Sequence, residues 1–365
     1  MRFPEFSGVW TKTLLNNYLE ENKERNKRGI FTKNHVLSVS GDFGIVNQIE
    51  LLGRSFAGKS VLDYHVVRTG NIVYTKSPLK EYPYGIVKVN GGVDGIVSTL
   101  YAVYKVKETA NGKFVEYYFG LPNRTNRYFK PIVRIGAKHD MKIGNDEVLA
   151  NYVVFPCVDE QKRISDFICL LDERIATQIK IIEKLESLIK GLCQKLIQQG
   201  NPNTALNEAL VCYSSTLQES SVQEAGDYPV FGATGVCGYT DAPEVDGDSI
   251  LIIKDGASVG VTYYASGKYS AIGTLNRLVA KRGYSLRYLY YCLKVFNFAP
   301  YRTGLAIPHI YFRDYGKAKV WCPSLDEQQR IADALSKVEQ KIAIEKSLLE
   351  QLYSQKRFLL QAMFI

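Results

Sequence analysis

The sequence predicts an α+β protein built as an internal repeat, in which two long antiparallel coiled-coil helices separate two globular domains and give an approximate two-fold relation. Three observations predict it: a repeat at an offset of 167 residues, a heptad pattern in both copies, and positive charge confined to the globular parts. The repeat is the strongest of the three signals.

The repeat is clearest where each predicted helix begins. Residues 153–166 read VVFPCVDEQKRISD, and residues 320–333 read VWCPSLDEQQRIAD, so that Pro, Asp-Glu-Gln, Arg-Ile and Asp recur at fixed spacing. In both copies the proline ends an extended segment, and the aspartate three residues later suits the first turn of a helix. Chance does not plausibly produce such a match.

Both copies carry apolar residues at alternating steps of four and three, which is the pattern of a coiled-coil seam. The predicted seam comprises Ile164, Ile168, Leu171, Ile175, Gln178, Ile182 and Leu185 in the first copy, and Ile331, Leu335, Val338, Ile342, Glu345, Leu349 and Leu352 in the second. Gln178 and Glu345 occupy the same seam position. This polar layer either fixes helix alignment or is a tolerated solvated defect, and the sequence favours neither reading.

The repeat divides the chain into four segments. A first globular domain is predicted at 1–152, a first spacer helix at 153–200, a second globular domain at 201–319 and a second spacer helix at 320–365. Because the ends of a domain usually lie close together, the second helix is expected to start near the end of the first and to run back antiparallel to it.

Net charge follows the same division. The two globular segments carry net charges of +8 and +1, whereas the two helical segments are neutral. Within the second globular segment, residues 201–253 hold eight acids and no Lys or Arg, while residues 254–319 hold eleven bases and two acids. Each globular part therefore has a basic stretch, for which nucleic acid is the natural polyanionic partner.

The remaining composition bounds the environment. The seven cysteines form no CxxC pair, which argues against a zinc site or a disulfide framework and favours a reducing cytoplasm. The N-terminal residues lack an apolar signal core, and the sequence has no long apolar run, so secretion and membrane spanning are not expected.

Several motifs suggest catalysis but lack the context that the chemistry needs. Residues 53–60 fit the phosphate-binding pattern GxxxxGK[ST], yet a strand-like stretch follows Ser60 where a helix is required. Asp172 and Glu173 resemble the acids of a nucleoside triphosphatase but lie inside the heptad helix. The four histidines have no metal-binding spacing, and residues 201–204 lack the second proline and the aromatic residue of an adenine methyltransferase motif. No catalytic or metal-binding residues are predicted.

The globular parts repeat more faintly. Residues 13–19 resemble residues 204–210, and the strand-like blocks 70–76 and 247–254 each lead into a loop bearing a lysine. Late in each domain an Arg-x-Gly sequence occurs, beginning at Arg134 and at Arg302. Two matched basic loops are therefore predicted.

A basic domain followed by this proline, Asp-Glu-Gln and Arg-Ile motif and a heptad helix, all occurring twice, closely resembles the DNA specificity subunits of Type I restriction and modification systems. The resemblance covers nearly the whole chain and is most specific at 156–164 and 323–331. It implies two target recognition domains that each read one half of a split DNA site, and helices that set the gap and dock methyltransferase subunits. It further implies S-adenosylmethionine on the methyltransferase partner, restriction subunits as additional partners, and no cofactor or catalysis in this chain.

Candidate DNA contacts are the Lys, Arg, Tyr and His side chains expected on the loops of the two domains. They are Arg54, Lys59, Lys76, Lys80, Arg134 and Lys138 in the first domain, and Lys254, Arg277, Tyr301, Arg302 and His309 in the second. Two other classes of function stay open from the residues alone: a non-catalytic coiled-coil adaptor with two ligand-binding heads, and a self-contained enzyme.

Overall fold

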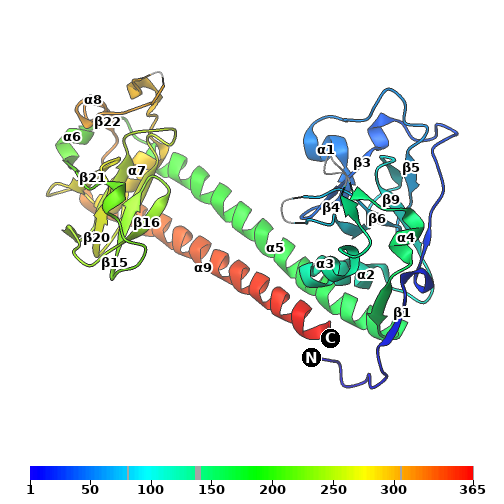
Figure 1. Cartoon of the computed structure of the whole chain (residues 1–365). Helices are drawn as coiled ribbons and strands as arrows, with labels where there is room; N and C mark the ends of the chain where they lie inside the picture. The colour runs from blue at the N-terminus through cyan, green and yellow to red at the C-terminus, as the bar shows by residue number, and fades with distance from the viewer. Residues whose placement is uncertain (80–81, 136–140, 305, 365) are drawn as a thin grey trace. The chain divides into compact units, whose positions relative to one another are not determined.

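The computed structural model describes residues 1–79, 82–135, 141–304 and 306–364, and it divides into two compact units (Figure 1). Unit 1 consists of Met1–Thr177 together with Glu350–Ile365, and unit 2 consists of Gln178–Leu349. Each unit therefore contains one globular body and a part of each long helix.

The body of unit 1 is organised around an antiparallel four-stranded sheet with the order β2-β9-β6-β7. Its strands are β2 (Leu19–Glu21), β9 (Ala102–Val106), β6 (Ile72–Tyr74) and β7 (Val87–Val89). Two-stranded pairs surround the sheet, namely β1 (Thr11–Leu14) with β12 (Tyr152–Phe155), β3 (Leu37–Ser40) with β4 (Gly44–Asn47), β5 (His65–Val67) with β8 (Gly95–Val97), and β10 (Arg134–Ile135) with β11 (Met141–Lys142). The helices are α1 (Gln48–Leu52), α2 (Gly112–Gly120), α3 (Pro122–Phe129) and α4 (Asn145–Leu149), with 3-10 turns at Leu15–Asn17 and Lys33–His35.

Unit 2 repeats this plan. Its antiparallel sheet has the order β14-β21-β18-β19, formed by β14 (Leu210–Ser214), β21 (Leu275–Ala280), β18 (Ser249–Ile253) and β19 (Thr262–Ala265). A second sheet contains β16 (Gly235–Thr240), β15 (Tyr228–Gly232), β20 (Lys268–Ala271) and β17 (Val245–Asp246), and β13 (Thr204–Ala205) pairs with β22 (Lys319–Val320). The helices are α6 (Leu206–Ala209), α7 (Leu286–Val295) and α8 (Phe312–Tyr315), with 3-10 turns at Glu219–Ser221 and Ala299–Tyr301.

The strand pairs that close the two bodies confirm the faint sequence repeat. Thr13 lies opposite Val153 in unit 1, and Thr204 lies opposite Val320 in unit 2. The predicted strand blocks become β6 and β18, which occupy the same position in their sheets. The segments predicted as spacer helices thus open with short strands, β12 and β22, which belong to the bodies.

Two helices of 40 and 39 residues, α5 (Val158–Ile197) and α9 (Leu325–Met363), follow those strands. In unit 1, Ile164 and Ile168 of α5 share a core with Leu359 and Met363 of α9. In the same unit Asp172, further along α5, forms an ion pair with Lys356, which lies earlier on α9 (2.5 Å).

In unit 2, Gln178 faces Glu345, while Cys193 and Ile197 near the end of α5 share a core with Ile331 and Leu335 near the start of α9. The two helices therefore run antiparallel within each unit, as Figure 1 shows. All fourteen predicted seam residues are buried or partly buried, as a coiled-coil seam requires. The predicted fold class is confirmed.

The glutamine of the repeated Asp-Glu-Gln motif joins each long helix to its body. Gln161 is fully buried; its amide donates to the carbonyls of Pro156 (3.0 Å) and Thr109 (3.2 Å), and its carbonyl accepts from the backbone N–H of Asn111 (2.9 Å). Asn111 is the N-cap of α2.

Gln328 repeats the arrangement in unit 2. It donates to the carbonyl of Pro323 (2.9 Å) and accepts from the backbone N–H of Ser285 (2.9 Å), the N-cap of α7. The motif recurs because the same junction is built twice.

The predicted polar layer is a hydrogen-bonded contact. The Gln178 amide donates to a carboxylate oxygen of Glu345 and to its backbone carbonyl (3.1 Å), and Lys341 pairs with the other carboxylate oxygen (2.5 Å). Both seam side chains are buried, with exposed fractions of 6% and 8%. A buried polar pair with mutual partners is not a solvated defect, so the structure supports a role in helix alignment.

Candidate nucleic-acid interface

The predicted contacts Arg54 and Lys59 lie in the exposed loop that follows α1. Gly53 ends α1 in the left-handed conformation (φ 75°), and the Arg54 guanidinium lies over the Phe56 ring at 4.6 Å. The chain then reaches the strand β5 and forms no helix after Ser60. The phosphate-binding motif is therefore excluded by geometry, as the sequence predicted.

Lys76 has a structural partner that the sequence did not reveal. Its Nζ donates to Asn145 Oδ1 at 2.8 Å, and the Asn145 amide donates to Glu21 at 2.7 Å. Burial lowers the pKa of the Lys76 ammonium, and the residue adopts a left-handed backbone (φ 44°) at the end of β6. This lysine links α4 to the sheet and is only half-exposed. It is therefore less available to DNA than the exposed side chains of Arg54 and Lys59.

Arg134 is exposed and opens the short pair β10–β11, in which it lies opposite Lys142. The first Arg-x-Gly sequence begins on β10, and its glycine lies outside the described residues. Lys80 and Lys138 were also predicted to contact DNA, and both lie outside the described residues.

His65, on β5, is a buried side chain for which the sequence predicted no role. Its side chain is almost fully buried, and its Nδ1 has no hydrogen-bond partner in the described structure. Burial lowers the pKa of His65 to about 4, assisted by the positive charges of Arg25 and Lys76. The imidazole is neutral in the folded unit at neutral pH.

This lowered pKa makes unit 1 less stable in acid. In the unfolded chain the histidine binds a proton near pH 6.5, so stability falls as pH drops from about 6.5 towards 4. Between pH 7 and 5 we expect a loss of roughly 1 to 2 kcal/mol of unfolding free energy, measured by urea titration of a Trp321→Phe chain in which Trp10 reports on unit 1. His65→Gln should remove this loss and the exposed-residue control His35→Gln should keep it; an equal pH dependence in His65→Gln would contradict the assignment.

In unit 2 the predicted contacts fall into two groups. Lys254 follows β18, and Arg277 lies on the central strand β21 with its guanidinium 4.3 Å from the Tyr213 ring. The other group, Tyr301, Arg302 and His309, lies on one loop. Tyr301 stacks against Phe296 (ring centroids 5.8 Å apart), and His309 approaches Asp255 at 3.6 Å.

Backbone hydrogen bonds between Thr303 and His309 in both directions, 2.9 and 2.8 Å, close that loop. Gly304 stands at φ 87°, and a Cβ there would lie 2.3 Å from the Ile307 carbonyl oxygen, so glycine is required. The second Arg-x-Gly sequence therefore enters a closed loop, and the first begins on the strand β10. That the two basic loops match, and that their side chains contact DNA, both stay predictions.

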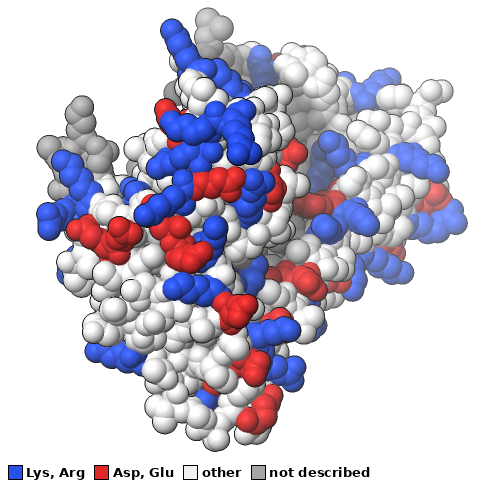
Figure 2. Space-filling view, turned by 90° about the vertical axis from the view of Figure 1, so that its right-hand side faces the viewer, with Lys and Arg blue, Asp and Glu red and all other residues white. Residues whose placement is uncertain are grey.

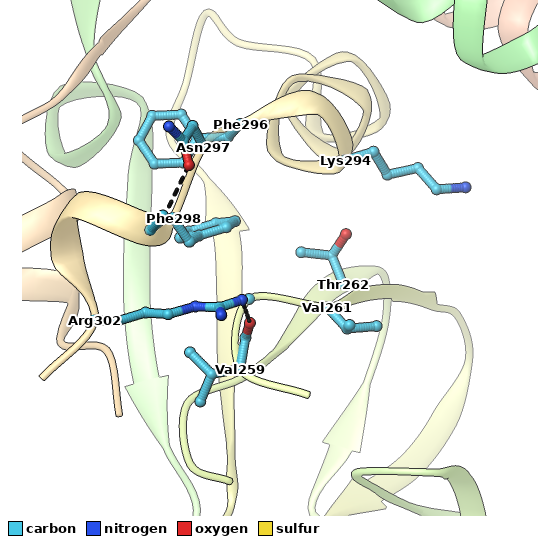
Figure 3. Close-up of a pocket in the computed structure, with 10 residues that line it drawn as sticks. Val259, Val261, Thr262, Lys294, Phe296, Asn297, Phe298 and Arg302 are labelled. Atoms are coloured by element: carbon cyan, nitrogen blue, oxygen red, sulfur yellow. Dashed lines mark hydrogen bonds between the residues drawn. The ribbon is translucent and has the colours of Figure 1, made fainter. Parts of the chain in front are cut away.

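A cavity of about 450 Å³ opens beside this loop (Figure 3). Its walls are the Val259–Thr262 segment and the stretch from Lys294 to Arg302. The Arg302 guanidinium reaches in beneath the Phe298 ring and donates to the Val259 carbonyl at 3.1 Å, while Lys294 extends towards the rim. A guanidinium beside aromatic walls suits a phosphate or sugar of a nucleic-acid strand.

Tyr311 and Arg313 were missed by the sequence analysis. They follow His309 at alternate positions, and the rings of His309 and Tyr311 are 6.2 Å apart, with the Arg313 guanidinium 4.8 Å from the Tyr311 ring. Tyr311 is 44% exposed, which is high for a large aromatic side chain. No single periodicity marks this group in the sequence, because His309 and Tyr311 precede α8 whereas Arg313 lies in it.

Within the described residues, no group of three or more His, Cys, Asp or Glu side chains is placed to hold a metal ion. None of the described helices has the length and apolar character needed to cross a membrane.

Comparison with known proteins agrees with this arrangement. Residues 213–354 match the family model of the Type I restriction modification DNA specificity domain. This part of the chain is therefore similar to that DNA specificity family. The matched region covers β14 to β21, the Thr303–His309 loop and most of α9.

Two curated members of the family are similar over shorter stretches. The Type I restriction enzyme EcoprrI specificity subunit of Escherichia coli is 27% identical over 115 residues, which is 32% of this chain and 29% of that protein. A putative Type I specificity subunit of Haemophilus influenzae is 29% identical over 89 residues, 24% of this chain and 23% of that protein. The matches thus span less than a third of either relative.

Solved structures extend the likeness in fold to the whole chain. The S subunit of a Type I restriction-modification system from M. genitalium has a TM-score of 0.65 at 16% identity, covering 100% of this chain and 99% of that one. A chain from a study of complex assembly and conformational transition of the type I R-M system has a TM-score of 0.57 at 16% identity, covering 99% and 98%. At this identity the likeness concerns the fold.

Proposed function

We propose that this chain is the DNA sequence-specificity subunit of a Type I restriction-modification complex. Each globular body reads one half of a bipartite DNA target, the paired helices set the spacing between the halves, and the same helices dock methyltransferase subunits. The chain contributes recognition and no catalysis. Methyl transfer from S-adenosylmethionine belongs to the methyltransferase partner, and restriction subunits complete the nuclease.

The observation that carries this proposal is the duplicated architecture. Both bodies have a four-stranded sheet with the same strand order, and in each an Arg-x-Gly sequence begins beside a short backbone pairing. Two similar frames with different loops suit a target of two different halves, because loop side chains read bases while a rigid frame positions them. A protein that bound its ligand through one globular body would not need a second body of the same fold.

The contacts divide by chemistry. Arg54, Lys59, Arg134, Lys254 and Arg302 supply cations for phosphates, which fix the position of the duplex without reading its sequence. Base edges are contacted by Arg277 and by the aromatic and imidazole side chains of the loop, Tyr301, Tyr311 and His309. Lys76 is a weaker candidate because its ammonium is already engaged by Asn145.

The first experiment is selection of duplexes from a randomised library by the chain together with its methyltransferase partner. The selected sequence should have two fixed blocks around a gap, and it should bind about a thousandfold or more tightly than a scrambled duplex. Affinity should fall steeply as salt rises, since cations that contact phosphates displace counterions. Equal, salt-insensitive affinity for every sequence would contradict the proposal.

A further inference from the structure

The two bodies differ in charge in the connection that leads from β2 to β6 in unit 1 and from β14 to β18 in unit 2. In unit 1 this connection, residues 22–71, contains eight Lys or Arg and four Asp or Glu. In unit 2 the equivalent connection, residues 215–248, contains seven Asp or Glu and no Lys or Arg. Net charges of +4 and −7 at equivalent places give the two connections opposite electrostatic character.

The positive charge in unit 1 is densest in one stretch. Residues 22–33 hold five bases and one acid, and we call Lys23, Arg25, Lys27, Arg28 and Lys33 the basic ridge. All members of the ridge except the half-buried Arg25 are exposed. Figure 2 shows Lys and Arg side chains gathered over the upper part of the face that it presents.

Two buried asparagines hold the backbone of the ridge. Asn22 donates to the Val66 carbonyl at 3.0 Å, and its carbonyl accepts from the Glu24 N–H at 3.1 Å. Asn26 donates to the Phe31 carbonyl at 2.7 Å and accepts from the Phe31 N–H at 3.0 Å. Their exposed fractions are 2% and 3%, so the loop between them is fixed from inside and its cations project from a rigid support.

The ridge borders a concave surface. A cavity of about 400 Å³ is lined by Arg25, Lys27, Arg28, Arg68 and the Phe31 ring, among others. Arg25 donates to the Asp63 carbonyl (3.0 Å), Lys27 pairs with the Asp63 carboxylate, and Arg68 pairs with Glu24 (2.6 Å) and Asp94 (3.0 Å). Lys23 approaches Glu21 at 3.9 Å. These acids only partly offset the ridge, and exposed pairs of this kind exchange readily for a stronger anionic partner.

We propose that the basic ridge of unit 1 binds the phosphodiester backbone of duplex DNA irrespective of sequence, and that unit 2 engages DNA without an equivalent element. This rests on the proposed function. Cations on a pre-ordered loop lose little conformational entropy on binding, and regularly spaced phosphates suit a row of cations. The acidic connection of unit 2 repels the same polyanion, so that unit approaches DNA through residues 254–319. Unit 1 consequently carries the larger share of sequence-independent affinity.

The test compares three forms of the full chain by fluorescence anisotropy, on a labelled duplex of randomised sequence, over a series of salt concentrations. Lys23→Gln with Lys27→Gln and Arg28→Gln should weaken binding roughly tenfold or more and reduce the slope of log affinity against log salt by about 2 to 3. The control removes the same charge from α5, with the exposed residues Lys184, Lys190 and Lys195 changed to Gln, and should leave the slope unchanged.

Asp63→Asn gives a change of opposite sign. It frees Lys27 from its acidic partner and should tighten binding a few-fold. This variant keeps the test decisive if the triple variant folds poorly, which Trp10 fluorescence would reveal.

An unchanged affinity and slope in the triple variant, or a loss equal to that of the control, would contradict the proposal that the basic ridge binds DNA. The proposed function would remain intact, because the wild-type chain would still bind duplex. A wild-type chain that binds no duplex overturns both. Ridge-dependent binding to vesicles of anionic phospholipid, with duplex binding unaffected, would assign the ridge to a membrane surface and overturn the proposal.

Discussion

Replacing Gln161 with alanine should lower the unfolding free energy of unit 1 by about 3 to 4 kcal/mol. The side chain is fully buried and makes three hydrogen bonds, all to main-chain groups. Its removal takes a partner from two carbonyls and one N–H, of which the Pro156 carbonyl is buried, and it also leaves a cavity. The loss falls at the junction between α5 and the body, where the two must unfold together.

The measurement uses the two tryptophans of the chain, one in each unit. In a Trp321→Phe background, urea unfolding followed by Trp10 should show the full loss for Gln161→Ala. Gln161→Glu keeps the shape but cannot donate to the carbonyls of Pro156 and Thr109, so it should be nearly as damaging as alanine.

The repeat supplies an internal control. Gln328→Ala removes two hydrogen bonds from the same junction in unit 2, and followed by Trp321 in a Trp10→Phe background it should cost about 2 to 3 kcal/mol. Losses below 1 kcal/mol in both variants would show that the motif glutamine does not stabilise the junction.

A second large effect is expected when a body is exchanged. A chain whose residues 201–319 come from a relative with a known target should, in complex with methyltransferase, read the relative's sequence in one half-site only. Preference at that half should change by about a thousandfold, with the other half unaltered. The exchanged segment must begin before β14, because β21 lies between β14 and β18 and a cut at residue 254 would pair strands from two proteins.

Anisotropy with four duplexes, carrying each combination of old and new halves, measures the effect. The reciprocal exchange of residues 1–152 is the matched control and should alter the other half alone. A change at both halves after a single exchange would contradict one-body, one-half recognition, and no change at either would place base reading outside the bodies.

The sequence predicted those features that depend on periodicity. The seam was legible from Ile164 to Leu185 and from Ile331 to Leu352 because heptad spacing alone places side chains on one side of a helix. The matched loops stay a prediction, based on the similar distances of Arg134 and Arg302 before the repeated prolines.

Features that depend on contacts between residues distant in sequence could not be predicted from the sequence. The Asn145 side chain that accepts a hydrogen bond from Lys76 is 69 residues away, and no residue near Lys76 in the sequence indicates this contact. The basic ridge was missed for the same reason, since Asn22 and Asn26 fix it through bonds to the carbonyls of Val66 and Val61, 44 and 35 residues away. Without those bonds, residues 22–33 look like a solvated charged loop.

The side chains of the motif glutamines hydrogen-bond only to backbone groups of the bodies they hold: the Thr109 carbonyl and Asn111 N–H in one, the Ser285 N–H in the other. Every amino acid but proline offers those same groups, so the attachment point places almost no demand on the amino acids of the body. The same junction can therefore hold bodies of different sequence. Such a body can be attached at the repeated motif while the two long helices are kept.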